Sequence, residues 1–113
     1  MDYIPERGDI VWLDFHPQAG HEQTGVRPAL ILSPREYNRK TGLAVLCPIT
    51  SHIKGYPFEV GLPDALKVKG VVLSDQLKNL DWKERRAAFK EKIPPTVLRE
   101  VLCKVAALLM IEP

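Results

Sequence analysis

Short apolar runs, separated by glycine and proline, recur along most of the chain. Residues 9–15 (DIVWLDF) are rich in β-branched and aromatic side chains and lie between Gly8 and a His-Pro pair, so they predict a strand. The sequence RPALILS at residues 27–33, closed by Pro34, predicts a second, mostly apolar strand. Further strands are predicted at residues 43–47, 57–62, 70–74, 76–80 and 85–93.

The segment near the C-terminus has helical periodicity instead. Thr96 is the expected N-cap, and the helix runs on to Met110. Glu100 falls close to the first turn, where its charge suits the helix dipole. Apolar side chains form one continuous stripe along this helix, at positions 97, 98, 101, 102, 105, 108 and 109.

Many short strands followed by one terminal helix predict a mainly β fold, a small, strongly bent barrel covered by the C-terminal helix. Short helical turns are expected within residues 35–40 and near residues 63–66. The length of 113 residues fits one domain, so residues 1–113 are treated as a single unit. A domain of this size has a small core, and an oligomeric interface would add to it.

Composition and charge are those of an ordinary water-soluble domain. Hydrophobic residues make up 45% and the net charge is +2, which permits nucleic-acid binding without requiring it. No signal peptide pattern opens the chain and no apolar run approaches the roughly 20 residues of a membrane span, so we expect a cytoplasmic protein without membrane contact. Cys47 and Cys103 lie in apolar stretches and are expected to be reduced core residues, with one disulfide as the alternative.

Common catalytic motifs are absent from the sequence. It has no glycine-rich phosphate loop, no zinc-binding spacing of Cys or His, and no close cluster of carboxylates like that of a two-metal nuclease. We therefore expect no metal and no cofactor. If these residues cleave a phosphodiester, the route open to them is attack by the substrate's own 2′-hydroxyl, which restricts the substrate to RNA.

The polar loop between the first two strands carries groups that such a reaction needs. It contains His21, Glu22 and Gln23, and it leads to Arg27 at the start of the second strand. A guanidinium held by a stiff strand suits bidentate binding of phosphate, and the structural alternative is an ion pair between Arg27 and Glu22. Glu22 is either a base or an orienting partner, and His21 is an acid, an RNA contact or an ordinary surface histidine.

A second candidate segment follows the third strand. The hydroxyls of Thr50 and Ser51 either cap a turn or, beside Arg27, donate to a phosphate oxygen. The loop after them alternates a cation with aromatic residues, as loops that contact single-stranded RNA do: Lys54, Tyr56 and Phe58. Asp75, which precedes Gln76, is either a turn-former or a buried polar anchor. The two tryptophans, Trp12 and Trp82, are interpreted as core or interface residues rather than platforms for base stacking.

Taken in this order, the segments resemble the MazF/PemK (Kid-like) family of toxin–antitoxin ribonucleases over nearly the whole chain. The matching segments are RGDIVWLDF at 7–15, GHEQ at 20–23, RPA at 27–29, PITS at 48–51, KGYPFEV at 54–60 and SDQ at 74–76. The resemblance implies a Src-homology-3-like barrel with a C-terminal helix, of the CcdB/PemK plasmid-toxin type, assembled as a homodimer. It also implies a toxin that cleaves single-stranded mRNA at specific sequences without metal, leaving 2′,3′-cyclic phosphate and 5′-hydroxyl ends. A protein antitoxin would silence it by occupying the RNA groove, with DNA bound only indirectly through the antitoxin complex.

The resemblance further implies roles for individual residues. The family's catalytic arginine and threonine match Arg27 and Thr50, and its loop glutamate matches Glu22. Other matched side chains are expected to bind RNA or to assist: His21, Gln23, Ser51, Lys54, Asp75 and Gln76.

One departure narrows the mechanism. A Kid-like subgroup uses a loop histidine and an aspartate before glutamine, which match His21 and Asp75, together with an arginine two residues before that aspartate. Leu73 stands at the arginine position here, so the mechanism built on Arg27 and Thr50 is preferred.

Two other functions remain as alternatives. The first is a gyrase-poisoning toxin of the same fold, although residues 110–113 (MIEP) lack the Trp-containing tail that such toxins use. The second is an RNA-binding barrel without catalytic activity.

Overall fold

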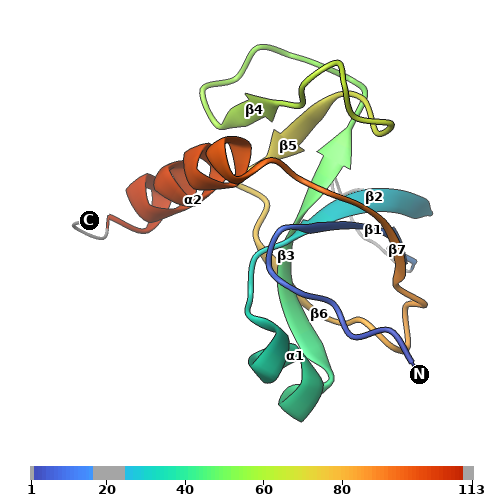
Figure 1. Cartoon of the computed structure of the whole chain (residues 1–113). Coiled ribbons are helices and arrows are strands. Elements are labelled where there is room, and N and C mark those ends of the chain that lie inside the picture. The colour runs from blue at the N-terminus through green and yellow to red at the C-terminus, as the bar shows by residue number, and fades with distance from the viewer. Residues whose placement is uncertain (1, 17–24, 111–113) are drawn as a thin grey trace.

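The computed structural model describes residues 2–16 and 25–110 (Figure 1). Within these ranges the elements are β1 (Asp9–Asp14), β2 (Val26–Ile31), α1 (Arg35–Thr41), β3 (Leu43–Thr50), β4 (Glu59–Gly61), β5 (Val71–Leu73), β6 (Lys78–Asp81), β7 (Ala88–Lys92) and α2 (Pro95–Leu109). Each predicted strand is present, and so are the terminal helix and the short helix after the second strand. Near residues 63–66 there is one hydrogen-bonded turn, from Leu66 N to Pro63 O at 3.1 Å.

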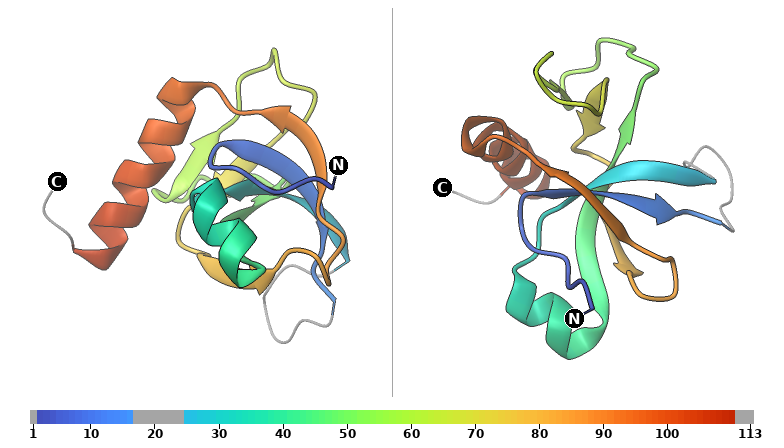
Figure 2. Two further views of the ribbon diagram at one scale, coloured as in Figure 1. Left: turned by 60° about the horizontal axis from the view of Figure 1, so that its bottom comes forward. Right: turned by 45° about the vertical axis from the view of Figure 1, so that its right-hand side comes forward.

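The long strand β3 organises the sheet. Its first half pairs with β6, its middle with β2 and its last two residues with β5, so it belongs to both parts of the sheet. The strand order is β4-β5-β3-β2-β1-β7, with neighbours antiparallel. The ribbon bends around β3 into a small barrel, with α2 along one side and α1 at one end (Figure 2). The prediction of a mainly β barrel with a C-terminal helix is confirmed.

β3 extends beyond the predicted end of the third strand. The sequence predicts a break before Pro48, because proline has no N–H to donate to a ladder. In the structure Pro48 lies within β3, opposite Ala29, at the last recorded pair between β2 and β3. A missing donor is tolerated there because the pairing with β2 ends at that point. The strand therefore carries Thr50, which would otherwise lie on a loop.

β1 and β2 each contribute side chains to two core clusters, one on each face, which accounts for their largely apolar sequence. Ile10 and Leu30 face a core cluster that contacts α2, where Val101 is fully buried. Val11 follows Ile10 on β1 and Ala29 precedes Leu30 on β2, and both face a second cluster that includes Trp82. The alternation follows from the two-residue period of a strand.

The helix α2 packs with only part of its apolar stripe. Residues 97, 98, 101, 102 and 105 contact the core, whereas Leu108 and Leu109 at the far end are exposed. The expected cap is wrong: the helix begins at Pro95 after Pro94, with no side-chain hydrogen bond from Thr96 and no acidic residue in the first turn. Proline serves there because the first N–H groups of a helix have no internal partner. Within the described ranges neither helix is long and apolar enough to cross a membrane.

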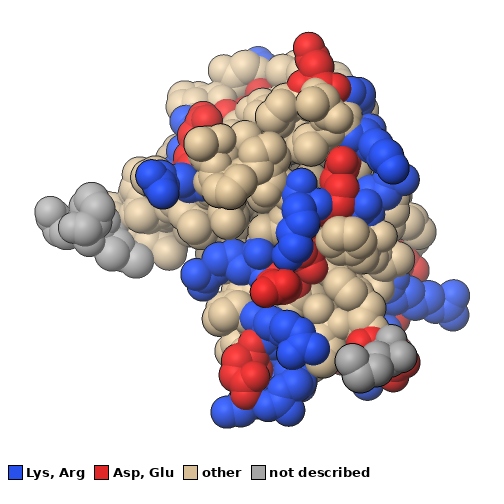
Figure 3. All heavy atoms as spheres, viewed as in Figure 1, with Lys and Arg blue, Asp and Glu red and all other residues tan. Residues whose placement is uncertain are grey.

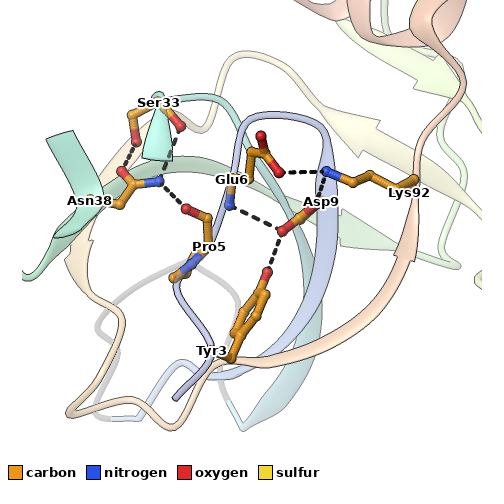
Figure 4. Close-up of polar contacts among 7 residues, drawn as sticks. All are labelled: Tyr3, Pro5, Glu6, Asp9, Ser33, Asn38 and Lys92. Carbon is orange, nitrogen blue, oxygen red and sulfur yellow. Dashed lines mark hydrogen bonds and ion pairs between the residues drawn. The ribbon is translucent and has the colours of Figure 1, made fainter. Parts of the chain in front are cut away.

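A buried carboxylate fastens the N-terminal segment to the barrel (Figure 4). Asp9 accepts hydrogen bonds from the Tyr3 hydroxyl at 2.5 Å and from the backbone N–H of Glu6 at 3.0 Å. The ammonium of Lys92 on β7 lies 2.6 Å from its other oxygen. Burial, with the neighbouring Asp9 carboxylate, raises the pKa of Tyr3 above its usual range. These contacts tie β1 to β7 and hold both strands in place.

Candidate active site

Arg27 and Thr50 approach each other from neighbouring strands. Arg27 is the second residue of β2 and Thr50 is the last residue of β3. Continuing the register by two residues from the pair Ala29 and Pro48 brings Arg27 level with Thr50. Both residues line two adjoining surface cavities. The structure thus brings together the two residues that the sequence singled out for catalysis.

The hydroxyl of Thr50 is oriented by its own turn. Its Oγ1 accepts a hydrogen bond from the backbone N–H of His52 at 3.1 Å. A hydroxyl has one proton to donate and two lone pairs to accept with, so this bond leaves the proton for another acceptor. The turn-capping and phosphate-binding interpretations of Thr50 are therefore compatible.

Gly70 sets the backbone position of Thr50. A Cβ at residue 70 would lie 2.1 Å from the carbonyl oxygen of Thr50 and 2.7 Å from its carbonyl carbon. The φ angle of Gly70 is +117°, a conformation that only glycine adopts readily. Sequence reasoning identified Gly70 only as the start of a strand, because a contact between residues 50 and 70 leaves no local pattern.

The first cavity has a volume of about 370 Å³ and contains every predicted site residue that the structure describes. Its lining also includes Leu73, the aromatic Tyr56 of the predicted RNA-contacting loop, and two residues to which the sequence assigned no site role, His52 and Glu59. The complete lining is Arg27, Thr50, Ser51, His52, Lys54, Tyr56, Glu59, Leu73, Asp75 and Gln76. Phe58, which the sequence grouped with the RNA-contacting loop, is half-buried and lies outside this lining.

Glu59 holds the loop that carries Lys54. Its carboxylate accepts the backbone N–H groups of Lys54 at 3.1 Å and of Gly55 at 2.8 Å. The ammonium of Lys54 lies 5.7 Å from the ring centroid of Tyr56, within the range of a cation–π contact. One carboxylate therefore fixes the backbone of a loop whose cation and aromatic ring face the same cavity.

Asp75 is exposed, so its interpretation as a buried polar anchor is wrong. The buried neighbour is Ser74, whose carbonyl oxygen lies 3.9 Å from the sulfur of Cys47. Burial, and secondarily the Asp75 carboxylate, raises the pKa of the Cys47 thiol to about 12. A thiol that stays protonated at neutral pH is a weak nucleophile. Cys47 is therefore a core residue, as predicted, whereas Cys103 is exposed and that prediction is wrong.

A second cavity of about 410 Å³ adjoins the first and shares Arg27, Thr50 and Ser51 with it. Its lining is Trp12, Val26, Arg27, Pro28, Ile49, Thr50, Ser51, Lys67, Val68, Lys69 and Lys90. Figure 3 shows basic side chains gathered on the right-hand side of that view, over the β4–β5 loop and β7. Trp12 is 38% exposed and is not a core residue, whereas Trp82 is buried, with its Nε1–H donating to Asn38 O.

Three predicted site residues, His21, Glu22 and Gln23, lie outside the described residues. The proposed ion pair between Arg27 and Glu22 therefore stays a prediction. The described site consists of a cation on β2, a hydroxyl on β3 and a loop with Lys54, all at the surface.

Comparison of the chain with known proteins identifies its family. Residues 6–109 match the family model described as PemK-like, MazF-like toxin of type II toxin–antitoxin system. The chain belongs to the PemK/MazF toxin family. It is 44% identical over 107 residues to the endoribonuclease toxin MazF of Escherichia coli strain K12, covering 95% of this chain and 96% of that protein. Family membership and this relative make the chain an endoribonuclease toxin.

Solved structures of the family support the fold of this toxin. The crystal structure of MazF from Deinococcus radiodurans superposes with a TM-score of 0.94 and 56% identity, covering 97% of this chain and all (100%) of that one. A MazE–MazF crystal structure from the same organism gives a TM-score of 0.88 and 50% identity, covering 98% of this chain and 100% of that one. The expected PemK-type fold is therefore confirmed.

In this toxin, the tertiary structure adds residues to the site that the sequence did not indicate. His52 and Glu59 line the first cavity, and three lysines line the second. Tyr56, which the sequence grouped with Lys54 in an RNA-contacting loop, also lines the first cavity. The lysines at 67, 69 and 90 come from a loop and a strand with no shared motif.

Proposed function

We propose that this toxin cleaves single-stranded RNA by attack of the substrate's 2′-hydroxyl on the adjacent phosphate, without a metal, leaving 2′,3′-cyclic phosphate and 5′-hydroxyl ends. The observation that carries this proposal is the convergence of Arg27 and Thr50 where two cavities meet. An RNA strand that spans both cavities puts a phosphate beside the two side chains. Single-stranded RNA suits the site because its bases can leave the stack and enter surface pockets.

Arg27 stabilises the charge that develops on the phosphate in the transition state. Its guanidinium offers a planar fork of donors that matches two phosphate oxygens, and it keeps its charge across physiological pH. Thr50 donates its hydroxyl proton to a phosphate oxygen, while His52 N–H fixes the orientation of that hydroxyl. Glu22 takes the proton of the 2′-hydroxyl or orients Arg27. As the 2′-oxygen bonds to phosphorus, the bond from phosphorus to the 5′-oxygen breaks, and Arg27 relays a proton to that leaving oxygen.

The remaining predicted residues bind the RNA on either side of the phosphate. In this proposal His21 and Gln23 contact RNA from the β1–β2 loop. The cavity-lining members of the set are Ser51, Lys54, Asp75 and Gln76. Lys54 neutralises a phosphate, and the amide of Gln76 hydrogen-bonds a base edge. These contacts, with the loops at residues 16–26 and 52–57, set the recognised sequence.

The proposed partners are a second copy of the chain and a protein antitoxin. Apolar side chains are exposed at the end of α2 and at the residue after it: Leu108 is 38% exposed, Leu109 52% and Met110 90%. Such a surface suits a homodimer interface. The solved MazE–MazF complex of a relative supports a protein antitoxin as partner, which in this proposal covers the RNA-binding cavities. In this proposal the toxin acts on cytoplasmic mRNA and contacts DNA only through the antitoxin complex.

The test is cleavage of a long RNA by purified protein in EDTA, with the cut ends mapped. We expect discrete cuts by the wild type and a loss of at least about 100-fold in rate for Arg27→Ala, since one donor to a transition-state oxyanion is worth roughly 10²–10³ in rate. The cleavage rate of Thr50→Val is expected to fall by a similar factor. Thr50→Ser is expected to keep more activity because it retains the hydroxyl.

Arg39→Ala is the matched control, since Arg39 is an exposed arginine on α1 that pairs with Glu36 and lines neither cavity. Undiminished cleavage by Arg27→Ala would overturn the assignment. Gyrase inhibition without RNA cuts would support the gyrase-poisoning alternative, and a mobility shift without cuts would support the RNA-binding barrel.

A further inference from the structure

The second cavity is the strongest feature that the proposed mechanism leaves unused. It meets the first cavity at Arg27, Thr50 and Ser51, so both cavities border the proposed position of the scissile phosphate, and their other lining residues differ. A phosphodiester joins two nucleotides, and a strand bound through the first cavity continues past Thr50. The second cavity is the surface that this continuation meets.

Trp12 gives this cavity a rigid aromatic surface. Trp12 is 38% exposed, although its neighbours Val11 and Leu13 on the other face of β1 are fully buried. β1 is paired on both sides at this point, with Trp12 opposite Pro28 of β2 and opposite Ala88 of β7. An exposed indole on a strand held from both sides loses little conformational freedom when a base stacks on it.

The charges of the two cavities differ in a way that favours phosphate in the second. The described lining of the first includes two carboxylates, Glu59 and Asp75, beside its cations. Among its described lining residues, the second includes four cations and no carboxylate: Arg27, Lys67, Lys69 and Lys90. Cations gathered next to an aromatic surface are the usual binding surface for a single nucleic-acid strand.

The lysine-bearing loop is held in place before any ligand binds. The carboxylate of Glu91 on β7 accepts the backbone N–H of Lys67 at 3.1 Å and of Val68 at 2.7 Å. Val68 is buried in the core cluster next to α2, and Lys69 Nζ donates to the carbonyl of Asp64 at 2.5 Å. The loop is closed at its base by the bond from Leu62 N to the carbonyl oxygen of residue 70 at 3.0 Å.

We infer that the second cavity is a nucleotide subsite for the part of the RNA strand beyond the scissile phosphate, in which Trp12 stacks on one base and Lys67 and Lys90 bind the neighbouring phosphates. The inference rests on the proposed function, because it takes the RNA to pass Arg27 and Thr50. Glu91 is a positioning residue for this subsite, since it holds the backbone of the loop and does not line the cavity.

The experiment measures binding of an RNA oligonucleotide that carries a 2′-deoxy nucleotide at the mapped cut, so that the nucleophile is absent. Bound RNA is expected to quench the fluorescence of wild-type protein, and Trp12→Phe is expected to remove that quench because Trp82 is buried. Trp12→Ala is expected to weaken binding by roughly 5- to 150-fold, the value of one base–aromatic stack.

The charge contribution is tested with Lys67→Gln/Lys90→Gln against Lys40→Gln/Lys83→Gln. The control pair removes the same charge from exposed lysines that line neither cavity. For the first pair, the slope of log affinity against log salt is expected to become shallower by about 1.4, since each phosphate contact to a single strand contributes about 0.7. The control pair is expected to leave the slope close to that of the wild type.

The outcomes separate this inference from the proposed function. If the wild type makes no cuts in RNA, the proposed function fails. If the wild type cuts but RNA gives no quench and the cavity variants keep wild-type affinity and salt slope, the subsite fails and the proposed function stands. If these variants lose only binding to a purified antitoxin, the cavity is a protein-binding surface and the subsite is likewise overturned.

Discussion

Gly70 has no side chain, and the backbone of Thr50 occupies the space where a Cβ would lie. A methyl group there collides with the Thr50 carbonyl and also requires a residue with a side chain to adopt a φ of +117°. The position of the proposed catalytic hydroxyl therefore depends on a residue that carries no functional group.

Gly70→Ala is expected to lower the free energy of unfolding by roughly 1–3 kcal/mol and to reduce cleavage by about 100-fold, since a displacement near 1 Å at a catalytic group has that effect. Gly61→Ala is the control, because a Cβ at residue 61 meets nothing within 4 Å and no positive φ is involved. Urea denaturation and the cleavage assay measure the two effects. Equal stability and equal cleavage rates for Gly70→Ala and Gly61→Ala would contradict the close contact between residue 70 and the Thr50 carbonyl.

The two cysteines are expected to differ in reactivity. Burial raises the pKa of Cys47 to about 12, whereas Cys103 is exposed. Iodoacetamide at pH 8 should therefore modify one thiol in the folded protein and two after unfolding, with Cys103→Ser reducing the folded value to zero. Modification of Cys47 at the rate of a free thiol would show that the core around Cys47 opens to solvent and would contradict this prediction.

The same shift predicts an alkaline loss of stability. The Cys47 thiol ionises near pH 9.0 in the unfolded chain and near 12 in the folded one, so stability is full below pH 9 and falls as the pH rises toward 12. The slope is about 1.4 kcal/mol per pH unit within this window. Cys47→Ala should have a shallower slope than the wild type between pH 9 and 10, and Cys103→Ser should not; the tyrosines are common to all three proteins, so their ionisation cancels in the comparison. Identical slopes for wild type and Cys47→Ala would refute the assignment.

At the scale of the elements, two carboxylates have the same task in different places. Glu59 on β4 holds the loop with Lys54, and Glu91 on β7 holds the loop with Lys67. Each accepts two backbone N–H groups, and such bonds to a charged acceptor are stronger than neutral ones. The strands thereby position loops that have no regular structure of their own.

Glu59→Ala is expected to speed hydrogen exchange at the amides of Lys54 and Gly55 and to raise KM several-fold with less effect on kcat. Glu59→Gln, whose oxygen still accepts, should restore part of the protection. Glu84→Ala is a suitable control, because Glu84 is an exposed residue outside both cavities. Unchanged exchange at the two amides in Glu59→Ala would show that the carboxylate does not hold the loop.

At the scale of the whole molecule, α2 extends its apolar stripe beyond the barrel. The inner part of the helix is packed, but Leu109 and Met110 are 52% and 90% exposed at its end (Figure 1). An apolar surface of this kind costs free energy in water unless a partner covers it. The proposed partner is a second copy of the chain.

Leu108→Glu/Leu109→Glu is expected to convert a dimer into a monomer, with the far-ultraviolet circular dichroism of the folded chain retained. Glu100→Gln, on an exposed position of the same helix, should leave the mass unchanged. Sedimentation equilibrium gives the mass of each variant. A wild type that sediments as a monomer of 12.8 kDa would disprove the dimer, and a dimer that persists in the double variant would place its interface elsewhere.

The sequence by itself determined the elements of this protein. Two-residue and helical periods, with the glycines and prolines between them, are local signals, and they predicted each strand and the helix α2 within a few residues. An arginine at the start of a strand, directly before Pro28, and two hydroxyls shortly after Pro48 also directed attention to Arg27 and Thr50, and the family resemblance then gave them roles.

Only the tertiary structure decided which faces are covered and which distant residues touch. Periodicity shows that a strand has two faces, but whether Trp12 lies in the core depends on how far its face is covered, and the described residues leave Trp12 38% exposed. Cys103 lies in an apolar stretch, yet its own side of α2 faces away from the barrel. The contact of Gly70 with Thr50, and the meeting of three lysines beside Trp12, join segments far apart in sequence. Such contacts follow from how the chain bends around β3, which no local pattern records.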